Sequence, residues 1–399
     1  MSIDSTQADL ARTIVSGERE GFDTRKHLEN ARKQAIERNL DDYFIVDTDA
    51  HHYETESWPD IVKYIEDPVL RHRAEQRDRH GRPVSLYHNH PGNQHVAGRI
   101  RRYPLRRFEQ TPPDVPRDVT LIRREMESIG IDVQIVFPTP MLQLGLNPNT
   151  SMEAQLSWAY SRWLTEEILP HDPRIKTMIY LPLNDVDACL RMIDKFGDAP
   201  GVVGFMVASG RHKPVHDNAY APIYHELQER GLPLGFHAIY NESERVFEGM
   251  NKFLSVHALG FVLYNMVHLT NMIVNGIPER FPNLKIIWIE SGLAWLPFLA
   301  QRLDNEYMMR TSEAPLLKKL PSDYIRENFY YTTQPMEYNN LEALEVTFTM
   351  IGATTQLMYA SDYPHWDFNL PSTIFDLPFL SDQDKRNILG ENARKVFNL

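Results

Sequence analysis

The stretch Phe44-Ile45-Val46-Asp47-Thr48-Asp49-Ala50-His51 runs from apolar residues directly into side chains that can bind a metal ion. Three later apolar runs end in the same way, in His237, Glu290 and Asp362. Buried parallel strands read as nearly continuous apolar runs, because helices cover the faces of such sheets. These four segments are therefore predicted to be buried strands that carry reactive groups at their carboxyl ends.

Eight short runs rich in Val, Ile, Tyr and Phe are spaced along the chain: Phe44–Asp47, Val133–Phe137, Ile175–Leu181, Val202–Val207, Leu232–Phe236, Leu284–Ile289, Phe329–Thr332 and Gln356–Ala360. Between them lie stretches with helical spacing of apolar residues, among them Thr150–Leu169, Val186–Phe196, Tyr220–Glu229 and Leu341–Ile351. Strand–helix alternation repeated eight times predicts an α/β fold of the (β/α)8 TIM-barrel type. An open eight-stranded sheet would give a similar pattern.

Two segments exceed the minimal repeat. Residues 1–42 are predicted to form a polar helical extension, and residues 43–399 one barrel with an insertion at about 54–117. The insertion holds ten arginines between Arg71 and Arg107 and only two acids. A guanidinium group can grip a carboxylate in bidentate fashion. Arg99 and Arg102 are therefore candidate substrate contacts, and both segments favour a homodimer or larger homo-oligomer.

Composition narrows the classes of function. Acidic residues number 54 against 42 basic ones, a net charge of −12, which argues against a nucleic-acid partner. The single cysteine, Cys189, excludes an intramolecular disulfide and a cysteine-rich zinc site. No secretory signal and no membrane-spanning apolar stretch are visible. We expect a cytoplasmic enzyme that acts on a small molecule.

The strand ends predict a metal site. Active sites of these barrels lie at the carboxyl ends of the strands, and the first and eighth strands are neighbours. Asp49 and His51 would then lie beside Asp362, with His237 approaching from across the mouth. Taken singly, each group has an ordinary structural explanation, as a turn residue or a hydrogen-bonded core histidine. Carboxylate oxygen together with imidazole nitrogen suits zinc, manganese, iron or cobalt.

Several motifs resemble the amidohydrolase superfamily, in the branch typified by aminocarboxymuconate-semialdehyde decarboxylase. The resemblance runs from about Phe44 to the C-terminus and rests on Asp49-Ala50-His51 with Glu54, Ile129-Gly130-Ile131-Asp132, Gly276-Ile277-Pro278-Glu279-Arg280-Phe281-Pro282-Asn283-Leu284-Lys285, Ser361-Asp362-Tyr363-Pro364-His365 and Ile388-Leu389-Gly390-Glu391-Asn392-Ala393. It implies that Asp49, His51, His237 and Asp362 bind the metal.

Three departures from that family shape the expected chemistry. The first strand offers Asp49 where relatives commonly have histidine, and Glu290 replaces a histidine that many relatives carry after strand six. The fourth strand ends in Val207-Ala208-Ser209-Gly210, with no lysine or glutamate to bridge two ions. We therefore expect one divalent ion, zinc first, with manganese, iron and cobalt as alternatives.

The reaction expected first is hydrolysis by metal-activated water. Asp362, Glu290 and His365 are the candidate catalytic groups, and Trp288 and Trp366 are candidate substrate contacts because aromatic side chains near the strand ends suit a planar substrate. Non-oxidative decarboxylation of an aromatic or dienoic acid is the alternative. A non-catalytic barrel is the third hypothesis, and the intact metal-binding set argues against it.

Overall fold

Eight parallel strands form one sheet whose spatial order follows the chain order, β1 to β8. The computed structural model describes residues 24–54, 57–76, 111–239, 241, 244–250, 252–365 and 367–399. The strands are β1 (Val46–His51), β2 (Val133–Phe137), β3 (Ile175–Tyr180), β4 (Val202–Ala208), β5 (Leu234–His237), β6 (Ile286–Ile289), β7 (Phe329–Thr332) and β8 (Leu357–Met358).

The sheet closes into a barrel through bonds between β1 and the segment that follows β8. Thr48 N donates to Tyr359 O at 3.0 Å, and Asp362 N donates to Asp49 O at 2.7 Å. The predicted (β/α)8 barrel is thereby confirmed, and the open-sheet alternative is wrong. β1 continues to His51 although polar residues interrupt its apolar run, because those side chains lie buried inside the barrel and form hydrogen bonds there.

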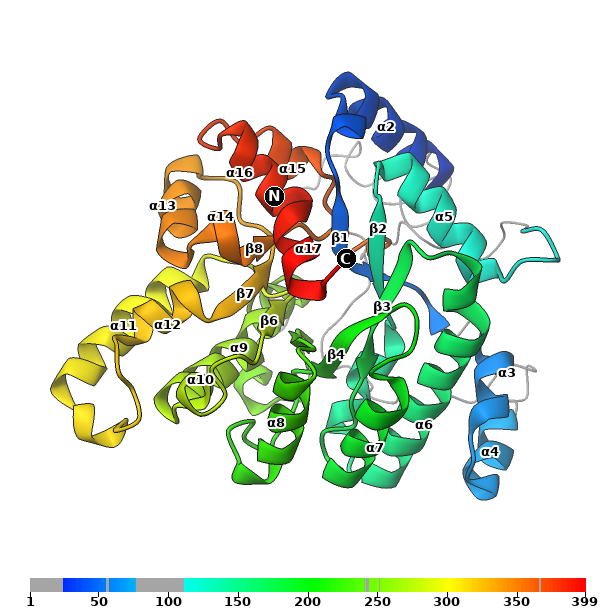
Figure 1. Ribbon diagram of the computed structural model, residues 1–399, viewed down its shortest axis with the longest axis horizontal. Coiled ribbons are helices and arrows are strands. Elements are labelled where there is room, and N and C mark those ends of the chain that lie inside the picture. The colour runs from blue at the N-terminus through cyan, green and yellow to red at the C-terminus, as the bar shows by residue number, and fades with distance from the viewer. Residues whose placement is uncertain are drawn as a thin grey trace, which may run out of the picture.

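Helices surround the sheet, as Figure 1 shows for most of them. They are α2 (Thr24–Glu37), α3 (Trp58–Ile61), α4 (Pro68–Glu75), α5 (Arg117–Ile129), α6 (Thr150–Trp163), α7 (Val186–Phe196), α8 (Ala221–Glu229), α9 (Phe253–Val274), α10 (Ile277–Arg280), α11 (Trp295–Met309), α12 (Pro321–Glu327), α13 (Leu341–Ile351), α14 (Ala353–Gln356), α15 (Ser372–Phe375), α16 (Asp382–Arg386) and α17 (Asn392–Phe397). No helix in the described ranges is long and apolar enough to cross a membrane.

Side-chain caps fix the starts of three predicted helices. Asn149 accepts from Met152 N at the start of α6, and Asp185 and Asn340 do the same for α7 and α13. A cap oxygen satisfies one of the backbone N–H groups that a helix start leaves without a partner. These helices consequently begin where the sequence indicates. The predicted stretch Thr150–Leu169 is less regular, because a π-helical turn, Leu164–Ile168, follows α6.

The two segments outside the repeat are described only in part. The helical extension contains α2, and the insertion contains α3 and α4. Residues 77–110, which include most of the insertion's arginines, lie outside the described residues. The division into an extension, a barrel and an insertion therefore stays a prediction.

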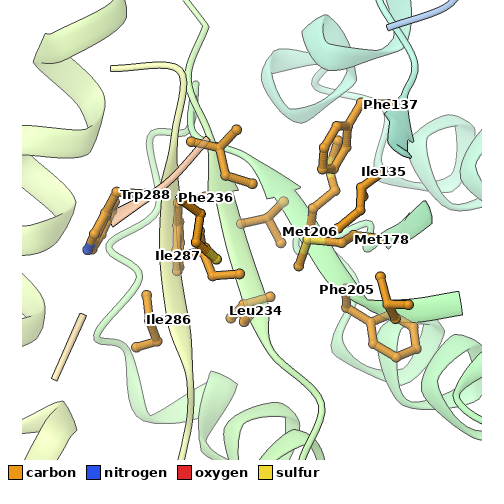
Figure 2. Close-up of a cluster of buried hydrophobic side chains, with 14 of the residues drawn as sticks. Ile135, Phe137, Met178, Phe205, Met206, Leu234, Phe236, Ile286, Ile287 and Trp288 are labelled. Carbon is orange, nitrogen blue, oxygen red and sulfur yellow. The ribbon is translucent and has the colours of Figure 1, made fainter. Parts of the chain in front are cut away.

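Apolar side chains fill the interior of the barrel. Figure 2 shows Met178 and Met206 among them. Gly235 leaves room for the facing side chain, because a Cβ there would lie 2.7 Å from Ile289 Cδ1 and would displace it. Strand side chains alternate, so the residues next to Gly235 and Ile289 point outward, toward the helices. The interior packing thus fixes which side chains at the strand ends can reach the mouth.

Candidate metal centre

Three side chains converge at the carboxyl end of the barrel. Asp49 and His51 lie on β1, and His237 is the last residue of β5. Asp49 Oδ1 lies 3.2 Å from His51 Nε2 and 3.3 Å from His237 Nε2. The two Nε2 atoms lie 3.2 Å apart. All three side chains are buried, so the structure brings together residues that are distant in the sequence.

In their neutral forms, the two imidazoles present unprotonated nitrogens to each other. His51 Nδ1 donates to Pro138 O, and His237 Nδ1 donates to Ala238 O, each at 2.9 Å. A hydrogen bond at one ring nitrogen sets the tautomer and leaves the other nitrogen as an acceptor. Two acceptors facing each other beside a carboxylate repel unless a cation lies between them. This arrangement of donor atoms is that of a metal site.

Further acidic and basic groups complete the cluster. Asp362 Oδ1 lies 3.3 Å from His51 Nε2 and accepts from His365 Nδ1 at 2.6 Å. Glu290 Oε2 lies 3.4 Å from His237 Nδ1. Ligand atoms of Asp49, His51, His237 and Glu290 all lie within 4.8 Å of one another, and so do those of His51, Asp362 and His365.

Backbone conformation helps to aim the two later acids. Glu290 and Asp362 have φ of 57° and 59°, the left-handed region that non-glycine residues rarely adopt. Ile289 points into the barrel, so an extended Glu290 would face the helices instead. The left-handed turn ends that alternation. Thr332 Oγ1 accepts from Glu290 N at 3.1 Å and holds the turn in place.

Burial dominates the electrostatics of the cluster. It lowers the pKa of His51 to about 4 and raises the pKa of Asp362 well above its usual range. Burial would also raise the pKa of Asp49, but the charge of His237 and hydrogen bonds from both imidazoles hold it below the usual range. Groups this close share protons in the metal-free protein, and a bound divalent cation would take the place of those protons.

The spacing of the donor atoms fits one divalent ion. Atoms bound to the same ion at about 2.1 Å lie roughly 3.0–3.4 Å apart in tetrahedral or octahedral sites. The three contacts among Asp49, His51 and His237 measure 3.2–3.3 Å. Asp362 Oδ1 lies 3.3 Å from His51 Nε2 but falls in the second group of ligand atoms, with His51 and His365. Asp49 Oδ2 and Asp362 Oδ2 are buried and have no hydrogen-bond partner among the described residues. Buried carboxylate oxygens require a counter-charge, and a cation supplies it.

A cavity of about 180 Å³ lies against this centre. Glu290 and His365 contribute to both the cavity and the metal centre. The other lining residues are Tyr53, Thr139, Leu142, Gln143, Ala238, Ile239, His257, Phe261 and Asp367. Aromatic rings therefore form part of the wall, together with two acids and two imidazoles, of which Glu290 and His365 also belong to the metal-binding groups.

Comparison with known proteins identifies the family. The family model described as amidohydrolase matches residues 87–399. The chain belongs to the amidohydrolase family. A gamma-resorcylate decarboxylase from a Rhizobium species is 24% identical over 286 residues, which cover 69% of this chain and 85% of that protein.

Solved structures share the amidohydrolase fold. A dihydroxybenzoic acid decarboxylase from Polaromonas, with bound manganese and the inhibitor 2-nitroresorcinol, gives a TM-score of 0.61 at 21% identity and covers 90% of this chain and 97% of its own. A 5-carboxyvanillate decarboxylase from Sphingomonas paucimobilis gives 0.61 at 21% identity and covers 90% and 99%. The predicted family resemblance is thus confirmed.

A buried carboxylate beneath the centre joins its two neighbouring strand ends in this amidohydrolase. Asp47 accepts from Ser361 N at 2.8 Å, from Ser361 Oγ at 2.5 Å and from Gln134 Nε2 at 3.1 Å. Asp49 N also donates to it, at 3.2 Å. Asp47 therefore fixes Asp49 and the residue before Asp362 together. Asp47 was not among the predicted site residues, although it lies two residues before Asp49 on the same strand.

The structure corrects one expected substrate contact of this amidohydrolase. Trp288 was predicted to touch the substrate, but it is buried on the helix side of β6 and stacks on Phe236 with ring centroids 4.9 Å apart (Figure 2). Alternation explains the error, because Ile289 takes the inward position beside it. Three other candidates, Arg99, Arg102 and Trp366, lie outside the described residues.

Sequence reasoning also missed four polar residues that line the cavity. They are Thr139, Gln143, His257 and Asp367. Thr139 and Gln143 follow β2, so their place after a strand was a usable signal. His257 lies in an apolar stretch of sequence, and nothing in that context reveals that α9 turns it toward the cavity.

Arg211 shows why the end of β4 carries no metal ligand. Its Nη2 donates to Glu153 Oε1 at 2.9 Å, and both side chains are buried. Ser209, nearer to the strand, donates its N–H to His237 O at 2.8 Å. The first polar groups after β4 are thus engaged with the protein itself, in keeping with a centre for one ion.

Proposed function

We propose that this amidohydrolase is a metal-dependent, non-oxidative decarboxylase of a small aromatic carboxylate. The cavity carries the proposal. A cavity of about 150 Å³ is enough to hold a benzene ring, and this one measures about 180 Å³, with Tyr53 and Phe261 in its wall. It therefore suits a single ring with a few small substituents. The metal-binding groups at its end are placed to receive the ring's carboxylate.

Asp49, His51, His237 and Asp362 would hold the ion, with zinc or manganese the best candidates. When bound, a divalent ion supplies positive charge that fixes and neutralises an anionic oxygen of the substrate. The protein's part is to orient the substrate and exclude water. Asp367, which belongs to neither group of metal-binding residues, brings negative charge to the lining, and this charge disfavours a free carboxylate elsewhere in the cavity. That charge distribution defines one orientation of the substrate.

Decarboxylation needs a proton for the ring carbon. The bond from that carbon to the carboxylate breaks, its electron pair stays on the carbon, and carbon dioxide leaves. A proton then replaces the lost group, so the sum is one carboxylate and one proton in, one carbon dioxide and one C–H out. Asp362, joined to His365 by a 2.6 Å hydrogen bond, is placed to deliver it. Glu290, at the cavity wall, is the second acid–base group.

The relatives support this reaction over the hydrolysis expected first. The similar proteins named above are decarboxylases of aromatic acids, and one of them was solved with manganese. Hydrolysis would use the same metal-binding groups with a base in place of an acid, so the site geometry is compatible with both. The names of the relatives favour the carboxy-lyase alternative.

Product analysis tests the proposal. The protein, loaded with manganese or zinc, is incubated with a panel of mono- and dihydroxybenzoates while carbon dioxide and the decarboxylated phenol are measured. We expect both products in equal amounts from at least one member, with no ¹⁸O from water in the phenol. Turnover of esters or amides with ¹⁸O incorporation, and no carbon dioxide from any acid, would overturn the proposal in favour of hydrolysis.

A further inference from the structure

Helix α9 carries a buried side-chain amide that lies at the ends of two strands, each followed or ended by a site residue. Asn265 Nδ2 lies 3.3 Å from Phe236 O and 3.4 Å from Ile289 O, and donates to both carbonyls. Phe236 immediately precedes His237, and Ile289 immediately precedes Glu290. One side chain therefore bridges β5 and β6 at the last residue before each functional group.

A third strand end joins the same amide. Ser209, the first residue after β4, donates its hydroxyl to Asn265 Oδ1. Its backbone N–H donates to His237 O at 2.8 Å, and its carbonyl accepts from His268 Nε2 at 2.7 Å. The carbonyl of His237 is thus tied to Ser209, which is in turn tied to α9 by both its hydroxyl and its carbonyl.

The cost of burying these groups argues that their bonds matter. From Phe253 to Val274 helix α9 contains no Asp, Glu, Lys or Arg, and among its few polar residues Asn265 and His268 are buried. A buried amide is unfavourable unless its donors and acceptor are satisfied. Both sides of the Asn265 amide are satisfied by the strand-end groups. An apolar residue would pack α9 against the barrel without fixing the positions of those groups.

We propose that Asn265 is a positioning residue that holds His237 in the geometry needed to bind the metal ion and fixes Glu290 beside it. It acts through the backbone of the preceding residues and contacts neither the ion nor the substrate. The inference rests on the proposed metal centre and is independent of which reaction that centre catalyses. Groups that orient metal ligands typically affect metal affinity by about 10–100-fold when they are removed.

Metal affinity of the purified protein is the test. Asn265→Asp keeps the size of the side chain but replaces the donating amide by a carboxylate that repels both carbonyls. We expect the metal-free variant to bind Mn²⁺ about tenfold or more weakly than the metal-free wild type in calorimetric titration. Thr270→Ala on the same helix is the matched control, because Thr270 donates only to Met266 O within α9. Its Mn²⁺ affinity should match that of the wild type.

Stability is measured in parallel, so that a merely structural role gives a different result. If Asn265→Asp lowers the melting temperature of the metal-free protein but leaves Mn²⁺ affinity unchanged, the positioning role is wrong. Should that variant fail to fold, Ser209→Ala removes only the hydroxyl that orients the amide, and an unchanged affinity in it would equally overturn the inference. A wild type that binds Mn²⁺ but releases no carbon dioxide would contradict the proposed reaction and leave this test intact.

Discussion

Glu290 and Asp362 share a left-handed backbone conformation, with φ of 57° and 59°, at the two strand ends that flank β7. They are the only buried non-glycine residues with positive φ in the described part of the chain. Such strain costs about 1–3 kcal/mol per residue and persists where the surrounding structure enforces it. Here it turns two carboxylates toward the metal-binding groups, so we infer that it was retained for the chemistry of the site.

Replacement of Asp362 by asparagine should abolish turnover while the fold survives. Asparagine tolerates the left-handed region better than most residues, so the backbone turn is retained. The variant keeps an oxygen near the metal-binding groups but loses the proton that a carboxyl group can give. We expect kcat to fall by at least about 100-fold. Circular dichroism and thermal unfolding check the fold, and near-wild-type turnover would contradict the assigned role.

The substitution Glu290→Gln tests whether this side chain transfers a proton, because it removes the acid–base group and keeps the size of the side chain. The amide has the size of the carboxyl group but cannot exchange a proton at neutral pH, so kcat should fall by about 100-fold or more. KM should change little if the side chain's part is proton transfer. Asp367→Asn is the comparison, since Asp367 lines the same cavity but belongs to neither metal-binding cluster. A raised KM with unchanged kcat in Glu290→Gln would make this residue a substrate anchor instead.

Removal of metal should lower stability. A ligand that binds only the folded protein stabilises it by about 2.7 kcal/mol at a concentration 100 times its dissociation constant. Protein dialysed against a chelator should therefore melt several degrees lower, and Mn²⁺ or Zn²⁺ should restore the loss. In His237→Ala the added metal should have no such effect. Metal analysis of the untreated protein gives the identity and the stoichiometry, for which we expect one ion per chain.

Much of this fold was predictable because the signals are local. Most buried parallel strands read as nearly continuous apolar runs. The cap residues Asn149, Asp185 and Asn340 mark helix starts within one turn. Asp49 and His51 were recognisable from their place after such a run. Their proximity to His237 follows from closure of the barrel, which the eightfold alternation implies.

Other features of the site depend on contacts that no local pattern encodes. The direction in which Trp288 points was decided by the inward position of Ile289, and the left-handed turn at Glu290 by the hydrogen bond to Thr332. The role of Asn265 arises from the packing of α9 across three strand ends. The face of the strand on which a residue lies, and its long-range packing, must be known before such side chains can be assigned to the cavity or to the core.

The buried ion pair of Arg211 and Glu153 should be costly to break on one side. Tyr180 Oη and Asn184 Nδ2 also donate to Glu153, at 3.2 and 2.8 Å. Arg211→Met leaves a buried carboxylate without its counter-charge, and we expect a loss of about 3–5 kcal/mol in the free energy of unfolding. Adding Glu153→Leu should recover much of it. Urea unfolding measures both effects, and equal stability of the single and double variants would refute the explanation.

A matched control for that pair lies at the end of α6, the helix that carries Glu153, and in the π-helical turn that follows it. Arg162 and Glu166 form an i,i+4 pair with side chains 32% and 42% exposed. Solvent-exposed pairs contribute about 0–1 kcal/mol, because water screens the charges and the side chains lose entropy. Arg162→Met should therefore change the free energy of unfolding by less than about 1 kcal/mol. A loss as large as that of Arg211→Met would show that burial is not the deciding factor.

His268 should make the protein less stable in mild acid. Burial lowers its pKa to about 4, because protonation would place a buried N–H at Nδ1, which has no hydrogen-bond partner among the described residues. The bond that Nε2 donates to Ser209 O acts in the opposite direction and is outweighed. The folded-state pKa lies below the unfolded value of about 6.5. The stabilisation of the neutral form is thus complete above pH 6.5 and is lost as the pH falls toward 4. Between pH 7.5 and 5 the loss should be about 2 kcal/mol.

Urea unfolding of the wild type and of His268→Gln at both pH values isolates this contribution, because the other titrating groups are common to both proteins. Glutamine keeps an N–H donor for Ser209 O and removes the titration. The wild type should lose about 2 kcal/mol more than the variant between pH 7.5 and 5. Equal losses in the two proteins would mean that His268 either is protonated in the fold or keeps an ordinary pKa there.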